Sequence, residues 1–339
     1  MTSETPSPSP ETFTSSPPSS PAPTRPEHSR WHHRRNQLLA IFVAILVVWV
    51  GGNLALHFGQ IHHDHLDYDI DKEFPPDQAT PPGELFASTL AAIMDHELHT
   101  GFGWRPNDFY LWGPKVMADN NSDRQLGIIM ATRETVRVFK DHLTKVSSNQ
   151  YDPNLVIADT DFRNDAERWI LPAPETKYQD GIDHLRAYVK GLNTTPPSSR
   201  ELNLRAVELI RLFQAWTDLL GDAHANLYRT KKDDGSPVRL WDCDHYFYHA
   251  QGYAHVLYWS MIALRREYAS LRKDDPILTA LFDDTIDALG RAAVMKPLVV
   301  LNGGPNSIFA NHRHNLDAYI NEARQKMYSI REELQRSPL

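Results

Sequence analysis

A chain of 339 residues, of which 41% are hydrophobic and 23% charged, has the composition of an ordinary globular protein and is long enough for a sizeable core. The formal net charge of −8 argues against a nucleic-acid partner, because such proteins need basic surface to meet phosphates. A single cysteine, Cys243, excludes an intramolecular disulfide, so packing must stabilise the fold.

The N-terminal segment, residues 1–35, has a composition typical of a disordered chain. Residues 1–26 contain 8 of the 24 prolines together with many serines and threonines, and they have almost no large apolar side chains to bury. We therefore expect a disordered tail.

An apolar segment at residues 36–57 follows this tail and predicts a transmembrane helix. Residues 38–56 carry no charge, and such a helix covers roughly 28 Å, close to the ~30 Å hydrocarbon core of a bilayer. Arginines precede the segment and aspartates follow it, so the positive-inside rule places the tail in the cytoplasm and the rest of the chain outside. A cleaved signal peptide is the alternative, but its charged region would be unusually long and no A-x-A site follows. We therefore expect an uncleaved signal-anchor.

Residues 58–82 predict a juxtamembrane linker rich in histidine and aspartate. His62, His63 and His65 are candidate ligands for zinc or copper, since His-rich tracts bind such metals. A solvated linker is the favoured interpretation, because a flexible tract lacks the surrounding groups that hold metal ligands in place.

The stretch HELHTGFGWRPND at residues 96–108 combines two histidines and a glutamate, as metallohydrolases do. The metalloprotease motif requires histidines four residues apart on one helix face, whereas His96 and His99 are three apart. We therefore interpret the pair as a polar helix end that the following glycines close.

After this helix end, Trp104 is expected to pack between helices as the buried anchor of a shaped turn. Asn107 and Asp108 are expected to bond neighbouring backbone N–H groups, as they do in turns and helix caps. The alternative is a recognition loop that displays these three residues to a partner.

Beyond the linker, apolar residues recur at alternating spacings of three and four, the pattern of helices packed along their length. The predicted helices cover residues 129–146, 182–192, 202–227, 247–271, 278–295 and 316–334. Ser198 and Ser199 are expected to cap the third of them, residues 147–178 form the least regular stretch, and no strand pattern competes. The expected fold class is all-α, an elongated helical bundle in one domain, residues 83–339.

Two further candidate sites lie on the predicted helix 247–271 and at its start. His245 and His249 are four residues apart beside aspartates and are candidate metal ligands, although a packed helix start is the favoured interpretation. Tyr253 and Trp259 belong to an aromatic row that could line a groove for an apolar ligand, but such a row is more often core. No G-x-S-x-G, phosphate-loop or dinucleotide motif is present, so neither a cofactor nor a catalytic residue is predicted.

Four short elements occur in the order and spacing of a known family. They are GWRPND at 103–108, RQLGII at 124–129, FYHAQGYAHVL at 247–257 and PLVVLNG at 297–303. With them the chain resembles the bacterial domain of unknown function family 2333 over residues 83–336 and the preceding anchor. The resemblance implies a Gram-negative inner-membrane protein with one span and a helical exported domain, and it implies no activity or ligand. Members tend to have an aromatic residue where this chain has Arg124, which leaves the packing role of that position open.

The span and the helical domain together predict a single-pass protein of the bacterial inner membrane whose periplasmic domain is an interaction or scaffolding module of the cell envelope. Its expected partners are the membrane and other envelope proteins or a second copy of the chain. Two alternatives stay open. One is the binding of a lipid or small apolar ligand between the helices. The other, a metal-dependent hydrolase, would need histidines and carboxylates from different helices to converge. An enzyme is the less favoured reading of the chain.

Overall fold

The computed structural model describes residues 27–61, 66–108, 120–145, 150–239, 242–271, 275–297, 299–303 and 308–336. By its internal contacts the chain divides into two compact units, Met1–Val50 and Gly51–Leu339. The expected disorder of residues 1–26 and the candidate ligands His62, His63 and His65 lie outside the described residues, so both stay predictions.

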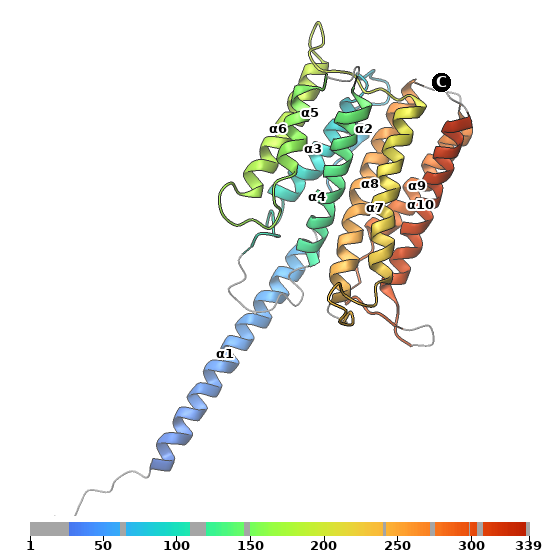
Figure 1. The fold of residues 1–339 in the computed structure, drawn as a ribbon. Coiled ribbons are helices and arrows are strands. Elements are labelled where there is room, and N and C mark those ends of the chain that lie inside the picture. Colours follow the sequence, from blue (N-terminus) through green and yellow to red (C-terminus); the bar gives the residue numbers. More distant parts are fainter. Residues whose placement is uncertain are drawn as a thin grey trace, which may run out of the picture. The chain divides into compact units, whose positions relative to one another are not determined.

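The first unit contains most of helix α1 (Glu27–Ile61), which begins inside the segment expected to be a disordered tail (Figure 1). The last proline of the tail, Pro26, directly precedes this helix, and no proline follows within it. Within α1, the 22 residues Trp31–Gly52 are long and apolar enough to cross a membrane, and their apolar window is not buried.

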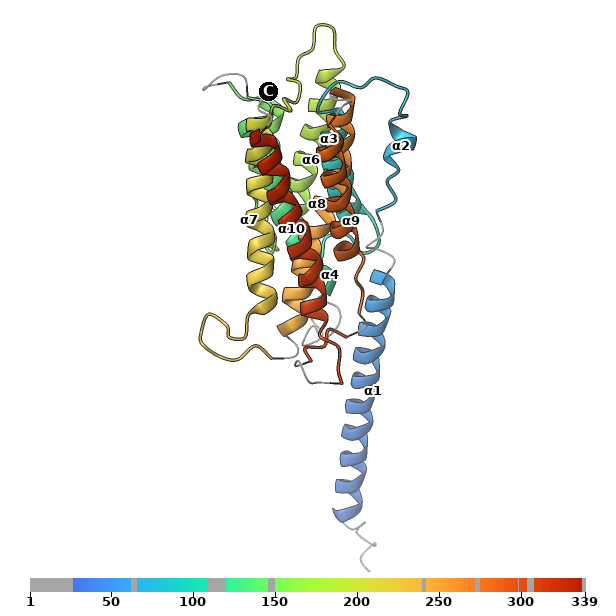
Figure 2. The ribbon, with the colours of Figure 1, turned by 90° about the vertical axis from the view of Figure 1, so that its right-hand side faces the viewer.

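The second unit is a bundle of antiparallel helices. Its long members are α3 (Glu84–His99), α4 (Asn120–Val138), α7 (Ala206–Tyr228), α8 (Cys243–Leu271), α9 (Pro276–Ala293) and α10 (His312–Arg336). Helix α8 lies at the centre, since it packs against the other five, and α10 lies beside α7 and α9 (Figures 1 and 2). The described ranges contain two isolated β-bridges and no strand, which confirms the all-α fold.

A second group of elements packs around this bundle. The hairpin of α5 (Pro153–Phe162) and α6 (Pro174–Leu192) covers α3 and α4, a π-helical turn η1 (Phe139–Leu143) ends α4, and α2 (Ile70–Glu73) precedes α3. Residues 147–178, expected to be the least regular stretch, thus contain all of α5 and the start of α6, with an irregular segment at 163–173 between them.

The prolines in this stretch start helices instead of interrupting them. The Asp152 carboxylate accepts hydrogen bonds from the backbone N–H groups of Asn154 (3.0 Å) and Leu155 (3.4 Å), and so caps α5. Pro153 and Pro174 occupy the first turns of α5 and α6, where a missing N–H costs nothing.

Helix α7 begins later than the apolar spacing predicts. It starts at Ala206, and Ser198 and Ser199 do not cap it, because their backbone N–H groups bond to the Gly191 carbonyl at the end of α6. Leu202 is nevertheless buried, and its N–H donates to the Pro82 carbonyl (2.9 Å). The apolar spacing therefore predicted burial correctly and the start of the helix incorrectly.

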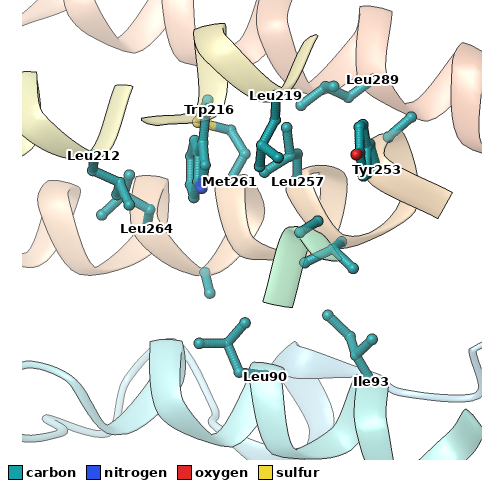
Figure 3. Close-up of a cluster of buried hydrophobic side chains, with 14 of the residues drawn as sticks. Leu90, Ile93, Leu212, Trp216, Leu219, Tyr253, Leu257, Met261, Leu264 and Leu289 are labelled. Atoms are coloured by element: carbon teal, nitrogen blue, oxygen red, sulfur yellow. The ribbon is translucent and has the colours of Figure 1, made fainter. Parts of the chain in front are cut away.

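The core of the bundle consists of leucine, alanine and aromatic side chains from all the long helices. Figure 3 shows Trp216 of α7 beside Met261 of α8, with Leu90 and Ile93 of α3 on the other side of α8. The Trp216 indole N–H donates to the Thr135 hydroxyl of α4 (3.0 Å), so this fully buried ring keeps its polar atom bonded.

Helices α4 and α8 approach each other most closely at two glycines. A Cβ atom added to Gly127 would lie closer than 3.0 Å to the His249 carbonyl oxygen, and one added to Gly252 equally close to the Arg124 carbonyl oxygen. Any other residue would push the two backbones apart. The elements RQLGII and FYHAQGYAHVL, far apart in the chain, therefore pack directly on each other.

Candidate functional site

The turn after α3 is built as the sequence predicts. Helix α3 ends at His99, and Gly101 and Gly103 have φ angles of 61° and 68°, in the left-handed region that favours glycine. The Trp104 side chain is buried, and its indole N–H donates to the Ala166 carbonyl (2.9 Å). The Trp104 ring also meets the Tyr178 ring edge to face, with centroids 5.0 Å apart. The prediction of a buried anchor is confirmed.

The polar residues of this turn make different contacts from those expected. The Asn107 amide donates to the Arg168 carbonyl (3.3 Å) and the Glu175 carboxylate (2.9 Å), both in the α5–α6 hairpin. The exposed Asp108 carboxylate pairs with the buried Arg105 guanidinium. For Asn107 the expected bond to a neighbouring N–H is wrong, because the hairpin lies against the turn and offers acceptors that the local sequence does not reveal.

Gln125 of α4 connects this turn to α3. Its amide donates to the carbonyls of Glu97 (3.3 Å) and Gly103 (3.0 Å), and its carbonyl accepts the backbone N–H of Arg105 (2.9 Å). One fully buried side chain thus bonds the last turn of α3 and both sides of Trp104. Gln125 therefore fixes the end of α3 against α4.

A buried ion pair lies beside Gln125. An Arg124 guanidinium nitrogen is 2.9 Å from the Glu97 carboxylate, and their side chains are 1% and 0% exposed. The side-chain oxygen of Asn121 accepts a longer bond from the same guanidinium (3.5 Å). We call Glu97, Asn121, Arg124, Gln125 and His255 the polar cluster.

His255 of α8 completes the polar cluster. Burial, together with the Arg124 guanidinium, holds the pKa of His255 well below its ordinary value, so the ring is neutral at physiological pH. The cluster joins α3, α4 and α8 inside the bundle, and both side chains of its ion pair are shielded from solvent. This arrangement positions helices and keeps charges inside the core.

The two candidate histidines of α8 lie near the start of α4. The His245 ring is 2.5 Å from the Asp123 carboxylate, and His249 is half-buried, which lowers the pKa of its ring. Among the residues that the structure describes, no three histidine, cysteine, aspartate or glutamate side chains are placed to hold a metal ion. The geometry brings together one carboxylate and one histidine from different helices, which form a hydrogen-bonded pair.

The two candidate aromatic residues have different environments. Tyr253 is fully buried, and its hydroxyl lies 3.4 Å from the Asp222 carboxylate of α7. Trp259 is half-buried and meets the rings of Tyr68 and Tyr258 edge to face, with centroids 6.2 and 5.4 Å apart. Both side chains pack against the core.

A further buried carboxylate holds the other end of α3. Glu267 of α8 accepts the backbone N–H groups of Gly83 and Phe86, each at 3.0 Å, and so caps α3 where Gly83 has no side chain to do so. Burial raises the pKa of Glu267 to about 7, although these two hydrogen bonds oppose the rise. Both ends of α3 are thus held by buried polar side chains of other helices.

The polar cluster and Glu267 were missed by the sequence reasoning. A signal was present, because Glu97 lies seven residues after Leu90 and three after Met94, on the apolar stripe of its helix. Arg124 likewise precedes Ile128 by four. Opposite charges on the buried stripes of two helices indicate a buried pair, since an isolated buried charge is too costly.

Comparisons with known proteins give one match. Residues 29–233 and 211–337 match the family described as "Uncharacterized protein conserved in bacteria (DUF2333)". These ranges include α1, the turn at Trp104 and the polar cluster. No curated protein and no solved structure matches the chain.

Proposed function

The chain belongs to this family of uncharacterized bacterial proteins, and we propose that it is a single-span inner-membrane protein whose helical domain lies in the periplasm. In this proposal the domain is an interaction or scaffolding module of the cell envelope. Its partners are other envelope proteins or a second copy of the chain.

The observation that carries the location is the exposed apolar surface of α1. Leu38, Phe42 and Val47 are 68%, 62% and 63% exposed, and they belong to a continuous apolar stretch. In water such a surface costs about 25 cal/mol for each Å² of apolar area, whereas a bilayer core removes this cost. Arg30, Arg34 and Arg35 shortly before the stretch and the four aspartates at 64–71 after it support a periplasmic domain.

The interior of the domain supports the scaffolding role. Gln125 and Trp104 fix the turn after α3, Gly127 and Gly252 set the α4–α8 separation, and Arg124 pairs with Glu97. The residues of three sequence elements therefore serve to hold helices in place. A domain built in this way offers its outer surface to a partner.

The location predicts the behaviour of fusion proteins. Alkaline phosphatase, which is active only in the periplasm, is expected to be active when fused after Leu339, because one span reverses the side of the membrane. The control is the same enzyme fused after Arg35, before the span, where no activity is expected. An inactive Leu339 fusion at a normal expression level would show that the domain stays in the cytoplasm.

The scaffolding role predicts discrete complexes in intact membranes. Chemical crosslinking of the full chain in cells, followed by mass spectrometry, is expected to give defined species that contain the chain and an envelope protein or a second copy. The control keeps residues 1–61 and replaces the helical domain by an unrelated periplasmic domain. Identical species from both chains would contradict an interaction role for the helical domain.

A further inference from the structure

Helices α4, α6, α8 and α10 all begin at the same end of the helical domain (Figure 1). Two contacts fix the loops at this end, one between two loops and one between a loop and helix α8. The Asn107 amide bonds to the Arg168 carbonyl (3.3 Å), and the Tyr248 hydroxyl at the start of α8 donates to the Pro297 carbonyl (3.3 Å). The turn 99–108, the α5–α6 loop and the α9–α10 loop therefore belong to one end of the bundle.

The loops at this end expose large apolar side chains at their tips. The consecutive residues Trp169, Ile170 and Leu171 are 70%, 57% and 84% exposed. In the α9–α10 loop Ile308 and Phe309 are 95% and 62% exposed, and in the turn 99–108 Phe102 is 53% exposed. We call these six residues the apolar rim.

The opposite end of the bundle differs in kind. There, Val207 and Ile277 are 63% and 57% exposed as single apolar residues in the first turns of their helices, and the adjacent Val156 and Ile157 of α5 are only 38% and 40% exposed. Scattered exposed residues of this type are common on soluble surfaces, whereas adjacent exposed tryptophan, isoleucine and leucine side chains form an apolar patch of the kind that marks an interaction surface.

The path of the chain indicates what kind of partner the apolar rim meets. Leu66 is buried, and with Tyr68 it lines a groove beside His96 and Thr100 at the C-terminal end of α3, so the chain enters the domain at the end that bears the apolar rim. Only ten peptide units separate Leu66 from Leu56, the last residue of the apolar run, and they span at most about 35 Å.

We propose that the apolar rim inserts into the surface of the bilayer that α1 crosses. The inference rests on the proposed function, since it needs α1 to span that membrane. Tryptophan and phenylalanine favour the interfacial region of bilayers, and isoleucine and leucine gain free energy on leaving water. The short tether keeps the rim at a high local concentration near the lipid, so even weak insertion suffices to dock this end of the domain.

The test uses the full chain in vesicles of phosphatidylcholine and phosphatidylglycerol. An environment-sensitive fluorophore is attached to the single-site variants Ile170→Cys and Phe309→Cys, with Ile277→Cys and Val207→Cys as controls of similar exposure at the opposite end. Cys243 is buried, and burial raises the pKa of its thiol, so the unmodified chain serves as the unlabelled blank.

Rim fluorophores are expected to emit at shorter wavelength than the controls and to lose most of their emission to a quencher carried on the lipid. Equal emission and equal quenching at both ends would overturn the proposal. Rim fluorophores that are shielded from water but unaffected by the lipid quencher would also overturn it, because they would show that protein covers the rim. Extraction of the same vesicles with alkaline carbonate distinguishes failure of the proposed membrane span from failure of the rim insertion. Release of the chain would refute the membrane span itself, whereas a retained chain with unquenched rim fluorophores refutes only the insertion.

Discussion

Replacing Gly252 by alanine is expected to lower the free energy of unfolding by at least about 3 kcal/mol, the upper part of the range for overpacked cores. The added methyl group would lie closer than 3.0 Å to backbone atoms of Arg124 and Ile128 and 3.0 Å from the Gly127 Cα, and no rotation of a side chain can relieve these contacts. Gly127→Ala should behave alike, because its methyl group meets the backbone of His249. Urea unfolding of the detergent-solubilised chain, followed by circular dichroism, measures both effects.

Gly221 of α7 provides the matched control. It is also a helical glycine, but a Cβ there meets only the end of the Arg324 side chain, at 3.0 Å, which can move aside. Alanine is favoured over glycine within a helix by up to about 1 kcal/mol, so Gly221→Ala is expected to be neutral or stabilising. If Gly252→Ala unfolds at the same urea concentration as Gly221→Ala, the close crossing of α4 and α8 is not a feature of the folded chain.

The helices that the sequence predicted well are those whose apolar residues follow one stripe for several turns. Helix α8 shows this, because Phe247, Leu257 and Leu264 all fall on its predicted seam and all are buried. Helix boundaries were predicted less well. Asp152 and Pro153 resemble a break in the chain, yet an aspartate followed by proline is also a helix start, and only the packing of the next turn decides between the two.

The parts of the candidate site that depend on local sequence were predicted, and the parts that depend on distant contacts were not. Burial of Trp104 follows from local features, since glycine and proline around a large aromatic ring predict a tight turn with an anchor. The bonds of Gln125 and Glu267 depend on partners that are distant in sequence. The Glu267 carboxylate caps a helix 181 to 184 residues earlier in the chain, and no local pattern encodes such a contact.

Removing one member of the buried Glu97–Arg124 pair is the second change expected to have a large effect. Arg124→Met keeps much of the side-chain volume but takes the guanidinium away from a carboxylate that is 0% exposed. Breaking a buried pair in this way typically costs about 3 to 5 kcal/mol, because the remaining charge loses its compensation in the core. Glu97→Gln should also destabilise the fold, since the guanidinium then faces a neutral group.

The double variant Glu97→Gln, Arg124→Met distinguishes the effect of losing the ion pair from the effect of changing the side-chain volumes. It removes both charges, so we expect it to recover much of the stability that Arg124→Met loses, and the difference gives the coupling energy of the pair. Arg137 and Glu134 form the control on the same helix, with 2.8 Å between their charged groups but exposures of 37% and 31%. Arg137→Met should cost no more than about 1 kcal/mol, as exposed pairs do. Equal losses for Arg124→Met and Arg137→Met would mean that water reaches Glu97, and the polar cluster would then be open to a ligand instead of closed within the bundle.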